Sequence, residues 1–477
     1  MKKLIITLAA LICGLSLFGG TPTQDLLERL NQESPMAGSI MGVYAVRAGQ
    51  TIVEYNSNLR LVPASNLKLV TTGTAIHKLG AGYRFSTGIA YDGEISGGIL
   101  DGDIYIIGGA DPTLGANYEG TPSLEETFAQ WKAMLDKAGI RTVHGDILAD
   151  VSWLDGRNVH DSWNIDDLCY EYGAVPEGLN IRRNWFDLKV TNGASEGDKV
   201  EVESPYPWYT VSSEAVASPA KSGYDLISWS TDFTPEIRVE GSLGVDRSST
   251  TLEATNRFGA RSCAYEFQQY LCQNGIPVSG EARAQDFKYD VTMLGHTYSV
   301  PMKQIIADCN GVSDNFYAET LLRTLGREMT GSACYDSSNV ARKRVLEEMG
   351  VEKIADCKLR DGSGLARSNN ITPAFLVSFL QAMEKSPAFN EYYASLPIAG
   401  KTGTMKSRMR NAPQDIRFRV HAKTGSVGGV RSASGYIDAP DGDPGKRIVF
   451  SIILNNMVEE GLGTSVIDKI IESIAKE

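Results

Sequence analysis

The middle of the chain differs in character from both ends, and this contrast constrains the fold more than any other feature. From about Tyr83 to about Tyr289, short apolar runs are separated by turns rich in Gly, Ser, Thr and Asp, a pattern that is typical of β-structure. With 477 residues, the chain is too long for one ordinary domain. We therefore expect two or three packed units, with one or two small β-rich domains in the middle.

The two ends of the chain carry longer elements. Near the beginning, "TQDLLERLNQES" predicts a helix, and "SIMGVYAVRAGQTIVEYNSN" predicts two strands joined by a turn that contains glycine. Near the end, the segment from "FRVHAKTGSVGG" to "KRIVFSIILNNM" predicts three strands with tight turns in an antiparallel meander. The last helix, "SVIDKIIESIAKE", is not basic, so we expect it to pack on a sheet rather than on a membrane.

Residues 1–20 have the layout of a secretory signal peptide, with two lysines, an apolar run and then small residues. The apolar run is too short to span a bilayer, and Cys13 follows Ile12 where a lipidation site requires a small residue. We therefore expect export to the periplasm without a stable membrane anchor. The formal net charge of −12 argues against nucleic acid and anionic membranes as partners.

Cysteine and histidine give no sign of a metal site. The six cysteines after the expected signal peptide are an even number, as is common in an oxidising compartment, but their spacing does not select a disulfide pairing. Neither they nor the five histidines have the spacing of metal ligands, and we expect no metal and no other cofactor. These cysteines are Cys169, Cys263, Cys272, Cys309, Cys334 and Cys357.

Ser65 and Lys68 form a Ser-x-x-Lys motif in "LVPASNLKLVTTGTAIHKLGAG", an apolar segment that predicts a helix. Residues three apart lie on one face of a helix, so the lysine can take the proton that activates the serine hydroxyl. It acts as a base only if burial or a second cation lowers its pKa. The same spacing occurs in residues 218–221 and 473–476, but neither pair opens an apolar helix.

A second motif, Ser313-Asp314-Asn315, lies at the start of the helix predicted by "VSDNFYAETLL". Two interpretations fit it. Ser and Asp at this position cap a helix by accepting hydrogen bonds from free backbone N–H groups. Alternatively, Ser313 and Asn315 form one wall of a cleft, where Ser313 relays a proton to a leaving amine and Asn315 holds both a substrate amide and Lys68.

The third motif, Lys-Thr-Gly, occurs twice. The copy at Lys423 begins the predicted meander, where the strand presents Lys423 and Thr424 to a cleft and Gly425 lets a substrate backbone approach closely. The copy at Lys401 has no alternating pattern on either side and precedes the basic "TMKSRMR", which indicates a surface loop. We assign the chemistry to Lys423 and interpret Lys401 as a chance match.

These three motifs in this order are the set found in class A β-lactamases and penicillin-binding proteins. The interval between Lys68 and Ser313 is far longer than a compact β-lactamase needs. Together with "GGADPTLG", "GDILADVSWLDG", "DGSGLARSNNITP" and "LPIAG", the sequence resembles the penicillin-binding protein 4 family, the D-alanyl-D-alanine carboxypeptidase/endopeptidases of peptidase family S13. The resemblance covers nearly the whole chain after residue 20.

The resemblance implies an α/β (α+β) architecture. Residues 21–82 and 290–477 are expected to form a serine β-lactamase/transpeptidase-like domain, with an antiparallel sheet flanked by helices. Residues 83–289 are expected to interrupt this domain as a mostly-β insertion of two small nested domains.

The resemblance also implies roles for the motif residues. Ser65 is the acylated nucleophile, Lys68 its base, and Ser313 with Asn315 the cleft wall. Lys423 binds the terminal carboxylate of the substrate, and its charge would lower the pKa of Lys68.

Further roles follow from the same resemblance. Thr424 joins Lys423 in binding the carboxylate, and the backbone N–H of Ser426 forms an oxyanion hole with that of the nucleophile. Arg367 lines the site and Asp167 contacts the amino group of a diacidic side chain, although an ordinary surface ion pair explains either residue equally well.

The implied reaction is that of a serine-type D,D-peptidase of peptidoglycan stem peptides. It forms an acyl-enzyme at a D-Ala-D-Ala or D-Ala-diaminopimelate bond, which water then releases, and β-lactams bind covalently as substrate mimics. Three alternatives stay open. The first is a class A β-lactamase, which needs a Glu-x-x-Leu-Asn segment that is absent between Asn315 and Lys423. The second is a non-catalytic β-lactam sensor or wall-binding module. The third is a Ser-Lys esterase, which usually has a tyrosine motif in place of Ser-Asp-Asn.

Overall fold

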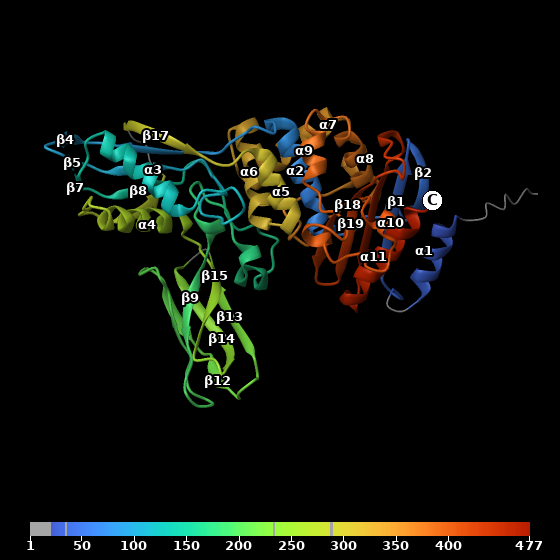
Figure 1. The fold of residues 1–477 in the computed structure, drawn as a ribbon, viewed down its shortest axis with the longest axis horizontal. Helices are drawn as coiled ribbons and strands as arrows, with labels where there is room; N and C mark the ends of the chain where they lie inside the picture. The colour runs from blue at the N-terminus through green and yellow to red at the C-terminus, as the bar shows by residue number, and fades with distance from the viewer. Residues whose placement is uncertain (1–20, 34–35, 232–233, 287–289) are drawn as a thin grey trace, which may run out of the picture.

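The computed structural model describes residues 21–33, 36–231, 234–286 and 290–477, so the expected signal peptide at 1–20, with Cys13, lies outside the described residues. Three bodies make up this part of the chain (Figure 1). A domain built from both ends carries one inserted body along its long axis, and a second inserted body projects sideways near their junction. Within the described ranges, no helix is both long and apolar enough to cross a membrane.

The terminal domain contains a five-stranded antiparallel sheet with strand order β18-β19-β20-β1-β2. The central strand β20 is buried along its whole length, as its continuous apolar run requires. The two expected N-terminal strands and the expected C-terminal meander are both confirmed. The strands are β1 (Ile40–Arg47), β2 (Gln50–Tyr55), β18 (Val420–Val427), β19 (Val430–Ile437) and β20 (Ile448–Asn455).

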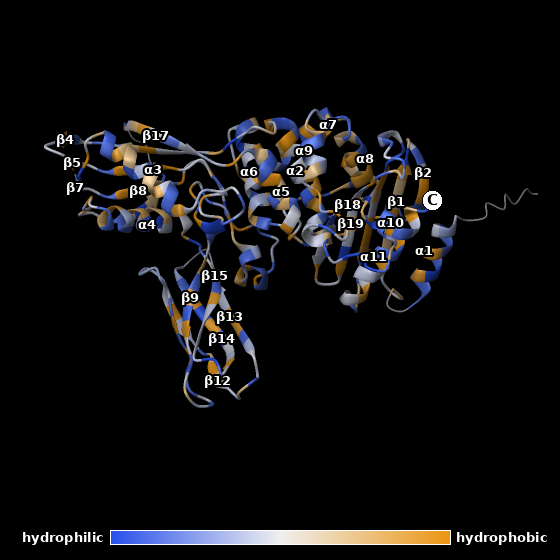
Figure 2. Cartoon of the chain, viewed as in Figure 1, coloured by the Kyte–Doolittle hydropathy of each residue, from blue (hydrophilic) through white to orange (hydrophobic). Residues whose placement is uncertain are grey.

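Helices cover both faces of this sheet, each over its own hydrophobic cluster. The terminal helices α1 (Pro22–Gln32) and α11 (Glu460–Ile474) pack on one face, and α8 (Pro373–Met383) packs on the other. Figure 2 shows apolar residues along the strands and on the helices beyond α8. Those helices are α2 (Leu67–Leu79), α5 (Met302–Val312), α6 (Asn315–Thr330), α7 (Tyr335–Glu348) and α9 (Phe389–Ala394), while the short α10 (Gln414–Arg417) precedes β18.

The first inserted body has a five-stranded sheet with order β16-β8-β6-β3-β17, together with a small sheet β4-β5-β7. Strand β17 pairs with β3, so this body continues to Tyr298, beyond residue 289 where the sequence placed its end. The strands are β3 (Ser86–Tyr91), β4 (Glu94–Ser96), β5 (Ile99–Asp101), β6 (Ile104–Ile107), β7 (Thr142–Val143), β8 (Ile147–Asp150), β16 (Ala282–Gln285) and β17 (Thr292–Tyr298).

Two helices, α3 (Leu124–Lys137) and α4 (Gly259–Gln273), pack in this body and were missed in the sequence. The beginning of α3 carries a signal that could have found it. Ser123 and Glu126 form a capping box, in which each side chain bonds the backbone of the other residue.

The second inserted body consists of β-strands in two small sheets, β10-β9-β15 and β11-β14-β12, with β13 paired to β14. Its core cluster is rich in aromatic side chains. In the described structure the six cysteines after residue 20 are free thiols. The strands are β9 (Trp185–Thr191), β10 (Glu201–Glu203), β11 (Thr210–Ser213), β12 (Val216–Ser218), β13 (Tyr224–Ser230), β14 (Glu236–Gly244) and β15 (Ser249–Thr255).

Candidate active site

Ser65 lies in a 3₁₀ turn, Ala64–Asn66, that leads directly into α2. On the first turn of α2, the side chain of Lys68 is fully buried. Its Nζ donates to Ser65 Oγ at 2.9 Å, to Asn315 Oδ1 at 2.6 Å and to the carbonyl oxygen of Ser363 at 2.9 Å. Burial lowers the pKa of Lys68, while nearby acidic groups oppose the shift. A lysine that loses its proton in this position can accept one from Ser65 Oγ.

The Ser-Asp-Asn motif joins α5 to α6. Asp314 is the cap of α6, because its carboxylate accepts the backbone N–H of Tyr317. Ser313 has left-handed backbone with φ 68°, and Asn315 contacts Lys68 as described above. The two interpretations of this motif are therefore compatible: Asp314 caps the helix, while the residues on either side of it face the cleft.

Lys423 approaches the same point from strand β18. Its fully buried Nζ donates to Ser313 Oγ at 2.8 Å and to the carbonyl oxygen of Thr424 at 2.7 Å. Burial lowers the pKa of Lys423, and the charge of Lys68 lowers it further. Burial is the largest cause of the lowered pKa of Lys68, and repulsion between the two ammonium groups disfavours charging both at once.

Gly425 packs against the nucleophile turn and is buried. A Cβ atom on this residue would lie 2.2 Å from Ser432 Oγ, 2.8 Å from the carbonyl oxygen of Pro63 and 3.0 Å from the backbone nitrogen of Ser65. The sequence analysis explained Gly425 by a close approach of the substrate backbone, and the structure adds a second reason, the close approach of the protein's own turn. Glycine is required because the strand passes so close to the protein's own turn at Ser65.

The second Lys-Thr-Gly copy lies in an exposed loop, as predicted. The Nζ of Lys401 is 4.1 Å from the centroid of the Phe418 ring. The loop still touches the motif strand, because Thr424 Oγ1 donates to Thr404 Oγ1 at 3.0 Å. In this structure the hydroxyl of Thr424 is therefore engaged by the loop that follows the second copy.

A cavity of about 320 Å³ opens at Ser65 and is lined by Ser313, Asn315 and Ser426. Asp167 and Arg367, for which a surface ion pair was the alternative interpretation, also line it. Lys423 is fully buried and contacts this wall through Ser313, to whose Oγ it donates a hydrogen bond. The lining residues that sequence reasoning missed are Tyr172, Gly364, Leu365, Val427 and Gly428.

Asp167 and Arg367 give the cavity one charge of each sign. Burial raises the pKa of Asp167, and the neighbouring charge of Asp166 raises it further. Its Oδ2 atom is buried without a hydrogen-bond partner. Arg367 donates from Nη1 to the carbonyl oxygen of Gly428. The wall of the cavity therefore carries one acidic and one basic side chain.

Glu319, one turn beyond Asn315 on α6, holds the loop that contacts Lys68. Its buried carboxylate accepts the backbone N–H groups of Gly362 and Ser363, the latter at 2.7 Å. Burial, followed by the charge of Asp361, raises the pKa of Glu319 to about 7. Sequence reasoning missed Glu319, although a carboxylate inside the apolar "FYAETLL" was a signal.

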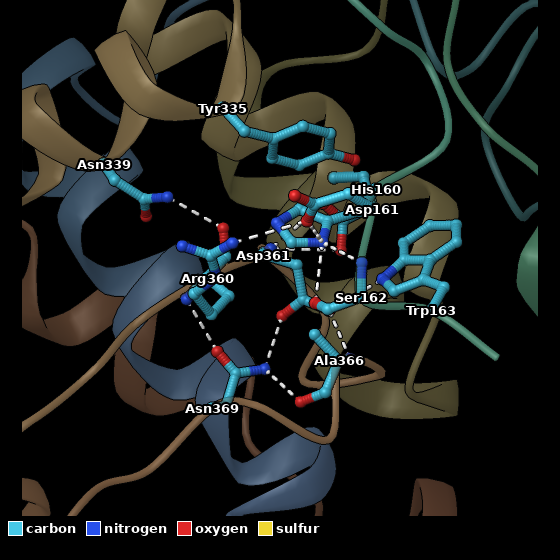
Figure 3. Close-up of polar contacts among 12 residues, drawn as sticks. His160, Asp161, Ser162, Trp163, Tyr335, Asn339, Arg360, Asp361, Ala366 and Asn369 are labelled. Atoms are coloured by element: carbon cyan, nitrogen blue, oxygen red, sulfur yellow. Dashed lines mark hydrogen bonds and ion pairs between the residues drawn. The ribbon is translucent and has the colours of Figure 1, made fainter.

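Asp361 begins this loop and ties it to the inserted region (Figure 3). Its fully buried carboxylate accepts the indole N–H of Trp163 at 3.0 Å and the side-chain amide of Asn369 at 2.8 Å. The backbone N–H of Ala366 donates to it at 2.6 Å. In the part of the chain that the structure describes, no group of three or more His, Cys, Asp or Glu side chains is placed to hold a metal ion.

Comparison with known proteins identifies the family. The model of the D-Ala-D-Ala carboxypeptidase 3 (S13) family matches residues 23–476. The chain belongs to the S13 family. A D-alanyl-D-alanine carboxypeptidase from Actinomadura sp. (strain R39) is 30% identical over 460 residues, which cover 91% of this chain and 81% of that protein. The resemblance to the penicillin-binding protein 4 family that the motifs indicated is thereby confirmed.

Solved structures share the fold of this S13 member. Penicillin-binding protein 4 from Haemophilus influenzae superposes with a TM-score of 0.81 at 24% identity, covering 94% of this chain and 98% of that one. A second structure of that protein, complexed with a β-lactam, has a TM-score of 0.77 at 23% identity with the same coverage. The predicted fold class is confirmed.

Proposed function

We propose that this S13-family protein is a periplasmic serine D,D-peptidase of peptidoglycan. It removes the terminal residue from stem peptides that end in D-Ala-D-Ala and also cleaves D-Ala-diaminopimelate cross-links. The observation that carries this proposal is the 2.9 Å contact between Ser65 Oγ and Lys68 Nζ, with Lys68 buried and its pKa lowered. The name of the Actinomadura relative points to the same reaction.

The reaction begins when neutral Lys68 accepts the proton of Ser65 Oγ, which attacks the carbonyl carbon of the penultimate D-Ala. The backbone N–H groups of Ser65 and Ser426 stabilise the oxyanion. Ser313 passes a proton to the leaving amine and takes a replacement from Lys423, whose Nζ donates to Ser313 Oγ at 2.8 Å. The bond to the terminal residue breaks, and an ester to Ser65 forms. Water then attacks this ester, and its released proton returns through Ser313 to Lys423. Lys68 gives its proton back to Ser65 Oγ as the shortened peptide leaves.

The charged groups around the cleft orient the substrate. Lys423 and Thr424 attract the terminal carboxylate, for which the hydroxyl of Thr424 exchanges its bond with Thr404. The Oδ2 atom of Asp167 has no hydrogen-bond partner in this structure. It accepts a hydrogen bond from the ammonium group of a third stem residue whose side chain carries both an ammonium group and a carboxylate. Arg367, which lines the same cavity, faces the carboxylate of that side chain.

Intact mass and peptide mapping after incubation with benzylpenicillin test this proposal in wild type and Ser65→Ala. We expect a stable adduct on the peptide that contains Ser65, and no adduct in the variant. Rapid hydrolysis of the drug without adduct would indicate a β-lactamase instead. No reaction at all would favour a binding module or an esterase.

Two synthetic substrates then separate the two peptidase activities. A pentapeptide ending in D-Ala-D-Ala reports carboxypeptidase activity through released D-Ala. A purified D-Ala-diaminopimelate cross-linked dimer reports endopeptidase activity through the monomers it forms. Ser65→Ala should abolish both.

A further inference from the structure

Asp314, the central residue of the Ser-Asp-Asn motif, is held by two side chains from the inserted region. Its side chain is 2% exposed, and Oδ1 accepts the backbone N–H of Tyr317 at 2.8 Å as the helix cap. Oδ2 accepts the hydroxyl of Tyr118 at 2.7 Å and Nη1 of Arg183 at 2.9 Å. A helix cap needs only one carboxylate oxygen. The second oxygen therefore links the motif to the insertion.

The backbone that carries Arg183 is conformationally unusual. Three consecutive residues, Arg182, Arg183 and Asn184, have left-handed φ angles of 48°, 57° and 52°. This conformation is unfavourable for residues with a Cβ atom, and it persists where surrounding contacts impose it, most often at functional sites. Here the side-chain amide of Asn184 holds the turn, because it accepts the backbone N–H of Ile181 at 3.0 Å and donates to the carbonyl oxygen of Val175 at 2.9 Å.

Aromatic rings fix the orientation of the guanidinium group. Arg183 lies over the ring of Tyr118 at 5.2 Å and over the ring of Trp185 at 5.6 Å, measured to the ring centroids. Tyr118 in turn packs edge-on against Tyr317 on α6, with ring centroids 5.3 Å apart. Arg183 is thus stacked, hydrogen-bonded and held by its own strained turn. Such a side chain presents its charge to Asp314 in one geometry.

The residues on either side of Asp314 contact the two catalytic lysines. Ser313 meets Lys423 at 2.8 Å, and Asn315 Oδ1 meets Lys68 at 2.6 Å. Since the three motif residues are consecutive, a rotation of the backbone at Asp314 displaces both contacts. The insertion touches Asn315 as well, because its Nδ2 donates to the carbonyl of Tyr172 at 2.9 Å.

We propose that Arg183 and Tyr118 are positioning residues for the reaction. By holding Asp314, they set the positions of Ser313 and Asn315 in the cleft wall. The inserted region is thereby part of the catalytic apparatus, and its contribution passes through one carboxylate oxygen. The inference rests on the proposed peptidase function, because its effect is read in acylation and in the release of D-Ala.

The experiment compares Arg183→Met with Arg182→Met. Both arginines belong to the same left-handed turn and both form ion pairs, but Arg182 pairs with Glu266 inside the insertion. The rate constant of acylation by benzylpenicillin, kcat and KM for D-Ala release, and Tm are measured for each. We expect Arg183→Met to slow acylation on the order of 100-fold, as for a misplacement of about 1 Å, with kcat falling more than KM rises. Arg182→Met should stay within about twofold of wild type.

A second pair removes single hydroxyl groups, so it serves even if Arg183→Met does not fold. Tyr118→Phe deletes the donor to Asp314, whereas Tyr206→Phe deletes a donor to Glu266 at 2.7 Å within the insertion. We expect roughly tenfold slower acylation in the first variant, as for loss of one hydrogen bond to a charged group, and no comparable loss in the second. Arg183→Lys, which keeps a donor for Asp314, should recover part of the rate.

Two results would overturn the proposal while wild type reacts normally. One is acylation at the control rate in both Arg183→Met and Tyr118→Phe. The other is an equal loss in Arg183→Met and Arg182→Met, which would mean that the turn only stabilises the insertion. A wild-type protein that forms no adduct and releases no D-Ala would instead refute the proposed function.

Discussion

Replacing Gly425 by alanine tests whether the Lys-Thr-Gly strand sets the position of the nucleophile. The new Cβ atom would lie 2.8 Å from the carbonyl oxygen of Pro63 and 3.0 Å from the nitrogen of Ser65, whereas ordinary contact begins at 3.4 Å. Ser432 Oγ can rotate away, but these two backbone atoms cannot. Subtracting both distances from 3.4 Å gives a displacement of about 0.4 to 0.6 Å for the turn that carries Ser65.

The size of this displacement sets the expected loss. A misplacement of about 1 Å costs on the order of 100-fold in rate, so half of it should slow acylation roughly tenfold. Overpacking should also lower the free energy of unfolding by about 1 to 3 kcal/mol. Stopped-flow acylation by a chromogenic cephalosporin measures the first effect, and urea unfolding measures the second.

Gly82→Ala is the matched control, because a Cβ atom at Gly82 meets nothing within 4 Å. It should react and unfold like the wild type. Acylation at the wild-type rate in Gly425→Ala, combined with reduced stability, would refute the reasoning. The packing against Ser65 would then serve stability alone.

Three further predictions concern charge, motif assignment and buried polarity. Burial raises the pKa of Glu177 from 4.5 to about 7, so the stability that its protonated form contributes is complete below pH 4.5 and is lost as the pH rises to about 7. The fall in Tm between about pH 5 and about pH 8 should therefore be smaller in Glu177→Gln than in the wild type. An equal fall in the two proteins would contradict this prediction. Lys401→Met should form the benzylpenicillin adduct within about twofold of the wild-type rate, whereas adduct formation in Lys423→Met should be slower by on the order of 100-fold. Similar rates in the two variants would refute the assignment of the chemistry to the Lys423 copy of the motif. Trp163→Phe removes the donor to Asp361 at 3.0 Å and should lower the free energy of unfolding in urea by about 1 to 3 kcal/mol, and a change below about 0.5 kcal/mol would show that the carboxylate finds another partner.

Much of the terminal domain was predictable because its signals are local. The apolar periodicity of α2, with Gly80 at its end, and the alternating strands of the meander each depend on neighbouring residues. The inserted region was less predictable. Its short strands give weak patterns, and β17 joins a sheet whose partner strand β3 lies about two hundred positions earlier in the chain.

The contacts of the site also differ in whether neighbouring or distant residues of the chain form them. Ser65 and Lys68 are one helical turn apart, so their proximity follows from sequence spacing. Tyr172 and Arg183 reach the motif from the insertion, and Arg183 is 131 positions from its partner Asp314. No local pattern marks such a contact, because it depends on how whole domains pack.

The sequence by itself determined which functional groups the protein carries and to which family it belongs, since motif identity and order are properties of the chain. Only the tertiary structure decided how those groups behave. It buried Lys68 and so lowered its pKa, it placed Gly425 against the turn of Ser65, and it brought Arg183 to Asp314. Burial and long-range contact arise when separate elements pack together, and their energies depend on distances that are absent from the linear sequence.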